Sequence, residues 1–200
     1  MAYPALVQDL IRLLSQLPSV GPKTAERYVF YLLEQKPELI EPLSKHLEQL
    51  GQTLGTCSIC GAISLSEHCN ICEDKARSDK VICIVATNQD LEAIESTGTY
   101  PGRYFILGGY LDTLNDIKPE DLRFEPLLNY LRQRPAIEEL ILAFDPTIEG
   151  ETTALYLNKL LEKWPGKISR LARGLSSGAN LEYADPLTLA NALKFRQNIK

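Results

Sequence analysis

Two closely spaced cysteine pairs constrain this chain more than any other feature. Cys57 and Cys60 form one CxxC pair, and Cys69 and Cys72 form a second pair after eight intervening residues. Four thiolates on two tight turns can surround one Zn²⁺ as a tetrahedron, at Zn–S distances of about 2.3 Å. Such a closed shell leaves no position for water. The sequence therefore predicts one structural zinc per chain, bound by Cys57, Cys60, Cys69 and Cys72.

Disulfide or redox chemistry is the alternative use of two such pairs. Disulfides belong to oxidising compartments, and residues 1–4 lack the charged and then apolar layout of a secretory signal. We therefore expect reduced cysteines and a cytoplasmic protein. His68 is predicted to be a loop residue, because the cysteines already fill the metal shell. Cys83 lies in an apolar run and is predicted to be a small buried hydrophobe.

Composition excludes some classes of protein. The chain has 200 residues, is 44% hydrophobic, and fits one large or two smaller globular domains. No apolar stretch approaches the roughly 20 residues that span a bilayer, so no membrane partner is expected. The net charge of −5 argues against a protein that coats nucleic acid through its overall charge. A local basic surface is still compatible, because attraction to phosphates acts within about 8–10 Å.

Residues 1–55 are predicted to be a helical domain. Leucines at helical spacing mark the first helix. The segment 17–25 then makes a tight turn into a second helix, where Pro22 suits the first position. Lys23 and Arg27 lie one turn apart on the polar side. The apolar side, predicted to be buried, consists of Ala25, Tyr28, Val29, Leu32 and Leu33.

This turn between two helices resembles a helix-hairpin-helix. In that motif the hairpin offers backbone N–H groups to a DNA phosphate at a helix N-terminus. The resemblance implies that Gly21, Lys23 and Arg27 contact DNA. Ser19 stands where the first of two glycines is usual. The alternative is that Lys23 and Arg27 belong to an ordinary solvated helix face.

A third helix is expected over residues 37–54. Its apolar residues recur three and four apart, as in a core-facing helix or in a seam against another subunit, and both alternatives stay open. They are Ile40, Leu43, Leu47, Leu50 and Leu54. Residues 56–76 form the zinc module, which is too short to bury a core. The metal is therefore expected to supply most of its folding free energy.

Residues 79–171 alternate between strand and helix patterns. This order predicts an α/β domain with a mostly parallel sheet covered on both faces. Functional groups of such sheets lie at the carboxyl ends of the strands, here the loops 86–88 and 145–151. Strands are expected at 80–86, 104–107, 139–144 and 168–171, and helices at 90–96, 126–133 and 152–163.

The second loop resembles that of a Toprim domain, the Mg²⁺-binding module of primases and topoisomerases. Catalytic Toprim domains hold Mg²⁺ with a Glu that ends the first strand and a later DxD pair. Asp145 matches the first Asp, but Ala86 and Thr147 replace the other two carboxylates. We therefore expect no enzymatic activity. Glu149 and Glu151 would bind a cation weakly or form the acidic first turn of a helix.

Residues 172–200 are predicted to be a tail that ends in a helix. Asp185 suits the N-cap and Pro186 the first helical position. The chain has no GxxxxGK[ST] loop, so ATP hydrolysis is not expected.

The order of these parts resembles the RecR family of bacterial recombination mediators. A helix-hairpin-helix, a four-cysteine module and a degenerate Toprim domain follow one another in both. The chain departs from the family at Ala86, where a Glu is more usual, and at 172–178, where a His, a Pro and a Val are usual. The strings that carry the resemblance are residues 17–23, both CxxC pairs, and residues 93–98, 146–151 and 181–185.

The resemblance implies a non-enzymatic DNA repair factor. It would be a clamp-like dimer or tetramer on single- or double-stranded DNA. It would act with RecO-like and RecF-like proteins to help load RecA on single strands, and its Walker-B-like tail would contribute to subunit association. Asp145, Glu149 and Glu151 would offer an acidic surface to a basic partner. Two alternatives remain: a Mg²⁺-dependent Toprim nuclease or primase, and a zinc-stabilised adaptor without DNA contact.

Overall fold

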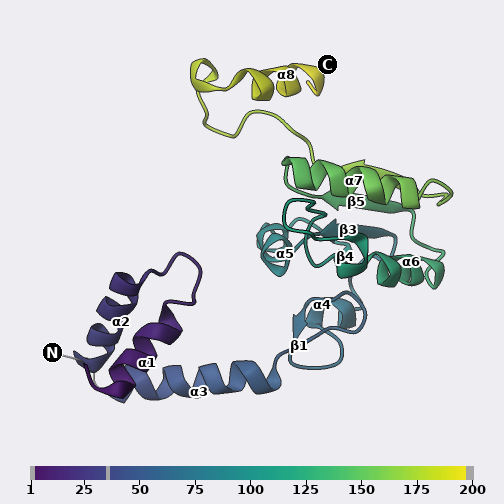
Figure 1. Cartoon of the computed structure of the whole chain (residues 1–200). Helices are drawn as coiled ribbons and strands as arrows, with labels where there is room; N and C mark the ends of the chain where they lie inside the picture. Colours follow the sequence, from purple (N-terminus) through teal and green to yellow (C-terminus); the bar gives the residue numbers. More distant parts are fainter. Residues whose placement is uncertain (1–2, 35–36, 197–200) are drawn as a thin grey trace. The chain divides into compact units, whose positions relative to one another are not determined.

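The computed structural model describes residues 3–34 and 37–196 (Figure 1). The chain divides into two compact units, the first ending at Leu54 and the second starting at Gly55. The predicted helical domain and tail extend over residues 1–2, 35–36 and 197–200, which lie outside the described residues. None of the described helices is long and apolar enough to cross a membrane.

The first unit is helical, as predicted. Helix α1 contacts α2, and the buried residues of α2 are Ala25 and Val29. Tyr28 and Leu33 were expected on the same buried face, but they are 42% and 59% exposed. That part of the prediction is wrong for a single chain, because one neighbouring helix covers only a narrow stripe of α2. The helices are α1 (Ala5–Leu14), α2 (Pro22–Glu34) and α3 (Pro37–Thr53).

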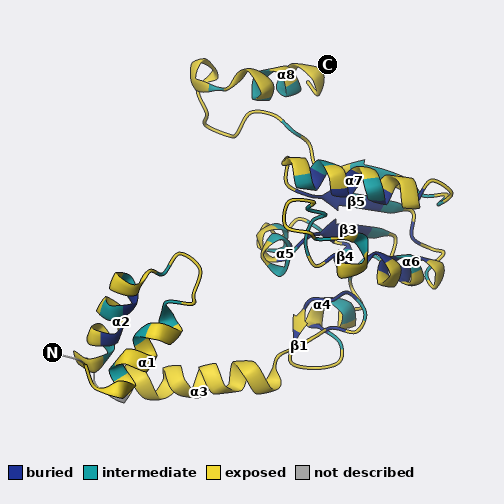
Figure 2. Ribbon diagram, in the orientation of Figure 1, coloured by how far each residue is buried: buried dark blue, intermediate teal, exposed yellow. Residues whose placement is uncertain are grey.

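Helix α3 is exposed along its length (Figure 2). Its predicted apolar stripe is 41–61% exposed at Leu43, Leu47 and Leu50. Core packing within the first unit is therefore not the role of this stripe. Leu6 and Leu13 of α1 are exposed as well, by 72% and 52%.

The second unit is built on a four-stranded parallel sheet with the order β4-β3-β5-β6. Its register places Cys83 of β3 opposite Tyr104 of β4 and Ile141 of β5. This confirms the α/β class and the predicted parallel sheet. The strands are β3 (Val81–Val85), β4 (Arg103–Ile106), β5 (Glu139–Ala143) and β6 (Lys167–Arg170). The helices that follow the cysteine region are α5 (Asn88–Glu95), α6 (Phe124–Arg132), α7 (Ile148–Leu160) and α8 (Pro186–Lys194).

Both faces of the sheet are covered. Successive strand residues point to opposite faces, and the residues on each face are apolar and pack in a core of their own. Ile82 and Phe105 face a core that α6 and α7 complete. Cys83 and Tyr104 face the other core, which contains α5 residues and the cysteine region. Cys83 is 2% exposed, as predicted for a small buried hydrophobe. Burial raises the pKa of its thiol to about 12, so the thiol stays neutral.

The cysteine region is a small module that packs on the sheet. It contains a two-stranded antiparallel hairpin, β1 (Gly55–Thr56) with β2 (Ile63–Ser64), and the single-turn helix α4 (Asn70–Glu73). Cys57 and Cys60 are each 1% exposed and belong to the same apolar cluster as Tyr104. The expectation that this module buries no core needs correction, because it shares the core of the sheet.

Candidate metal centre and DNA-binding hairpin

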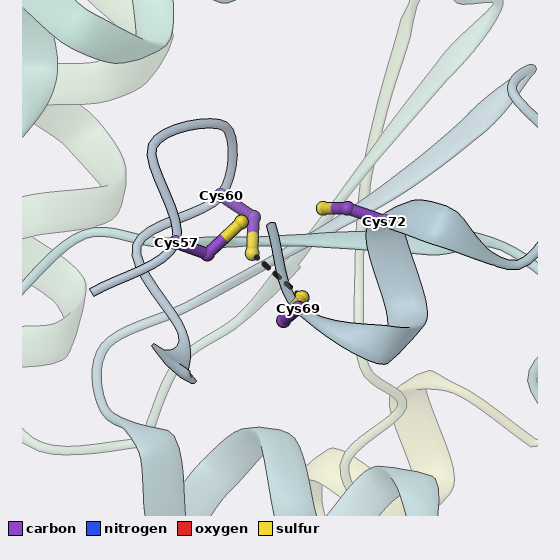
Figure 3. Close-up of side chains that lie close together, drawn as sticks. All are labelled: Cys57, Cys60, Cys69 and Cys72. Atoms are coloured by element: carbon purple, nitrogen blue, oxygen red, sulfur yellow. Dashed lines mark hydrogen bonds between the residues drawn. The ribbon is translucent and has the colours of Figure 1, made fainter. Parts of the chain in front are cut away.

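The four cysteine sulfurs converge on one point (Figure 3). All four Sγ atoms lie within 4.8 Å of one another. The Sγ atoms of Cys60 and Cys69 are 3.6 Å apart. A tetrahedral shell with Zn–S bonds of about 2.3 Å has S–S edges of about 3.8 Å. The structure thus brings together Cys57, Cys60, Cys69 and Cys72 around a volume that suits a single metal ion.

The first cysteine pair sits on a hydrogen-bonded turn. The Gly61 N–H donates to the Cys57 carbonyl at 2.9 Å, and the Ala62 N–H donates to Cys60 Sγ at 3.4 Å. Gly61 has φ +83°, a left-handed conformation that glycine adopts without steric cost. Gly61 was not predicted to take part in this turn, although a glycine directly after the second cysteine of a CxxC pair is a readable signal for it.

The second cysteine pair brackets the start of α4. Cys69 is the N-cap residue, and the Cys72 N–H donates to its carbonyl at 2.9 Å. One helical turn therefore brings both sulfurs to the same side. His68 takes no part in the cluster, as predicted. Across residues 3–34 and 37–196, no other group of three or more potential metal ligands comes together.

The four cysteine thiols influence one another's ionisation. A hydrogen bond from Cys72 lowers the pKa of Cys60 to about 5. Burial and the neighbouring Cys60 charge raise the pKa of Cys69 to about 11. The hydrogen bond to Cys60 and burial also raise the pKa of Cys72. The thiolates thus oppose one another's ionisation, and a divalent cation would offset that repulsion.

The hairpin before α2 is open at its tip and carries two exposed cations. Ser19 has φ +64°, so it takes the left-handed conformation at the position where the helix-hairpin-helix layout has glycine. A Cβ added at Gly21 would meet no atom within 4 Å, which leaves room for another molecule's backbone. Lys23 and Arg27 are both exposed on α2. In the described part of the chain, no acceptor takes the backbone N–H of Lys23 or Thr24.

The loop after β5 does not rebuild a Toprim cation site among the described residues. Ala86 is fully buried at the end of β3. Thr147 caps α7, and its Oγ1 accepts the Gly150 N–H at 3.1 Å. Asp145 is exposed, and its backbone N–H donates to Tyr110 Oη at 3.0 Å. The two positions that lost carboxylates therefore serve packing and helix capping.

The three remaining acids of this region have different surroundings. Glu151 accepts two hydrogen bonds from Arg170, at 2.6 and 2.9 Å, and forms an ion pair with Arg173. The Arg170 hydrogen bonds lower the pKa of Glu151 to about 2. Glu149 lies in the first turn of α7, where a negative charge suits the helix dipole. Most of the Glu151 charge is thus compensated within the chain, whereas Asp145 is open to solvent.

These features define a class of protein: a Toprim-type sheet without its full set of carboxylates, joined to a four-cysteine module and a helix-hairpin-helix. Three family models match the chain, and two of them confirm the helix-hairpin-helix and the Toprim domain. They are "RecR, helix-hairpin-helix" over residues 7–50, "Toprim domain" over residues 80–172 and "RecR, C-terminal" over residues 174–197.

Full-length relatives agree with these models. The chain is 43% identical to the recombination protein RecR of Rhodococcus jostii, covering 98% of this chain and 100% of the relative. It is 44% identical to RecR of Mycolicibacterium smegmatis, covering 96% of each. It is 43% identical to RecR of Thermosynechococcus vestitus, covering 99% and 97%. The chain belongs to the RecR family.

Proposed function

We propose that this chain is a DNA-binding recombination mediator and carries out no chemistry of its own. The observation that carries the proposal is the hairpin at residues 19–23, which combines a left-handed Ser19, an open Gly21 and exposed Lys23. Together with Arg27 these groups suit backbone phosphates, which position a protein on DNA irrespective of sequence. DNA binding by a variant without both cations tests the proposal.

The metal that we propose is zinc, one ion per chain, in a structural role. Four sulfur donors with CxxC spacing and full burial of the first pair favour a closed tetrahedral site. A reducing cytoplasm, in which thiols persist, suits this use of cysteine. We also propose the domain division 1–55, 56–76, 79–171 and 172–200.

The loss of Toprim carboxylates supports a non-enzymatic role. With Ala86 buried and Thr147 engaged as a helix cap, two of the usual Mg²⁺ ligands are gone. The nuclease or primase alternative needs those ligands. Mg²⁺-dependent nicking of DNA by the purified wild-type chain would overturn the non-enzymatic proposal.

We propose that the mediator acts as a homo-oligomer, a dimer or tetramer, with RecO-like and RecF-like partners in loading RecA on single-stranded DNA. Two basic side chains per subunit make a weak DNA site. Repetition of the hairpin around a clamp would strengthen binding through effective concentration. The exposed stripe of α3 supplies an apolar surface for such association.

Charge on that stripe should break the oligomer. We expect Leu47→Glu with Leu50→Glu to lower the mass in solution, because these side chains are 61% and 60% exposed in the single chain and would be buried at a subunit interface. Light scattering after gel filtration measures the mass. Leu114→Glu is the control, since Leu114 is 91% exposed in the second unit. An unchanged mass for the double variant would exclude α3 as the interface.

Asp145, Glu149 and Glu151 are the residues that we propose for contact with a basic, RecO-like partner. Because Arg170 and Arg173 hold Glu151 internally, Glu149 and Asp145 give the cleaner test. We expect Glu149→Lys to weaken partner binding several-fold, mainly through slower association, and Asp145→Lys to add to the loss.

The matched control for this surface lies just beyond the far end of α7. Glu162→Lys changes the net charge of the chain by the same amount as Glu149→Lys. Glu162 is exposed to solvent, whereas Glu149 is partly buried. Surface-plasmon time courses give the association rate and the dissociation rate separately. Repeating them at two salt concentrations tests the electrostatic part of the association rate. Equal binding by the Glu149→Lys and Glu162→Lys variants would exclude the acidic surface as the contact with the partner.

A further inference from the structure

The four-cysteine module covers the open edge of the sheet. Strand β4 is an edge strand, and the N–H of Ile106 at its end donates to the Cys60 carbonyl at 2.8 Å. Helix α4 contacts β4 as well. Ile59, between the first two cysteines, packs against both apolar cores. The module therefore straddles the β4 edge, where unpaired strand groups would otherwise meet solvent.

Arg103, the first residue of β4, holds the second cysteine pair. Its Nη1 donates to the carbonyls of Ile71 and Cys72 at 2.7 and 2.9 Å, and its Nη2 donates to the Asp74 carbonyl at 3.0 Å. Its Nε forms an ion pair with Asp79, and only 12% of the side chain is exposed. The last carbonyls of a short helix have no intrahelical partner. Arg103 supplies that partner and so fixes the turn that carries Cys72.

Arg123, just before α6, lies against the first cysteine pair. Its guanidinium stacks over the Phe105 ring at 4.9 Å and donates to the Ile106 carbonyl at 3.3 Å. A Cβ added at Gly61 would overlap this guanidinium, so the cation packs directly on the turn that follows Cys60. Burial lowers the pKa of Arg123, and the nearby Cys60 and Cys57 thiolates act in the opposite direction. The guanidinium is thus a half-buried cation next to the sulfur cluster.

We propose that Arg103 and Arg123 are positioning residues of the metal centre: each orients one CxxC pair, and together they couple metal occupancy to the β4 edge of the sheet. This inference rests on the metal site of the proposed function. Four thiolates around a divalent ion carry a net charge of −2, and a fixed neighbouring cation stabilises that excess charge. Groups that orient metal ligands in this way commonly govern affinity.

The two arginines differ in what they offer. Arg103 uses the fork of its guanidinium, because three carbonyls in different directions need separate N–H donors. Arg123 acts through its charge and its packing on Gly61. Substitution by lysine should therefore be tolerated better at 123 than at 103. If the two arginines served only the stability of the sheet, their substitution would not change the affinity for zinc.

The experiment measures zinc transfer from the full-length protein to a chromogenic chelator. We expect Arg103→Gln, Arg103→Lys and Arg123→Gln to weaken zinc binding about 10–100-fold and to speed release, as for other residues that orient metal ligands. Arg123→Lys should retain more of the affinity. The control is Arg134→Gln, because this arginine stacks on the nearby Tyr130 ring at 4.1 Å and donates no side-chain hydrogen bond to the described part of the module.

A second measurement separates metal positioning from general stability. The midpoint of thermal unfolding is compared for each variant with zinc bound and after zinc removal. We expect the variants to fall well below the wild type with zinc bound and to approach it after removal. An equal loss in both states, or zinc release no faster than in the Arg134→Gln control, would overturn the proposal. Wild-type protein without zinc on elemental analysis would instead refute the metal site itself.

Discussion

Replacing Cys60 with serine should release the metal and lower the thermal stability of the second unit sharply. Cys60 lies at the centre of the cluster: its sulfur is 3.6 Å from that of Cys69, and its carbonyl accepts the N–H of Ile106. Structural zinc contributes on the order of 10 kcal/mol or more of binding free energy in small modules. A site with three sulfurs should lose much of that binding free energy. Elemental analysis measures the zinc content, and calorimetry measures the thermal stability.

The control for this prediction is the remaining cysteine. Cys83→Ala also removes a buried thiol, but Cys83 lies outside the cluster. We expect a loss of about 1–2 kcal/mol from the small cavity and no loss of zinc. Equal zinc contents for the Cys60→Ser variant and the wild type, or a wild type that unfolds at the same temperature with and without a chelator, would contradict the structural role.

Replacing Lys23 and Arg27 together with alanine should abolish most DNA binding. A charged hydrogen bond to phosphate contributes about 1.5–3 kcal/mol, so each side chain accounts for roughly tenfold or more in affinity. The loss should be the same for unrelated sequences, because phosphates carry no base information. The plot of log affinity against log salt should also flatten by about 0.7–0.9 for each lost contact.

A matched double variant controls for net charge. Lys45→Ala with Lys163→Ala removes two exposed cations that lie outside residues 19–27 of the chain, and it should bind DNA almost as the wild type does. The fold of the test variant should survive, because Lys23 and Arg27 lie off the buried face that Ala25 and Val29 form. Titration of a labelled oligonucleotide at several salt concentrations provides the measurement. Full-strength binding by the Lys23→Ala, Arg27→Ala variant would favour the adaptor alternative.

Local patterns explain what was predictable here. CxxC spacing is a property of a few consecutive residues, so the convergence of the four cysteines followed from the two CxxC pairs. The alternation of strand and helix periods likewise predicted the parallel sheet, with element ends shifted by a few residues. At loop 145–151, the loss of Toprim carboxylates was visible as Thr147 and, after β3, as Ala86. The packing role of Ala86 and the capping role of Thr147 required coordinates.

The sequence by itself determined the four-cysteine cluster, the class of fold and the family resemblance, because each depends on residue type at short spacing. Only the tertiary structure decided the partners of charged groups: Arg103 reaches carbonyls about 30 residues away, and Glu151 is neutralised by Arg170 and Arg173. It also decided that the α3 leucines are exposed. Burial and pairing depend on which distant segments meet, and no local period of the chain encodes that.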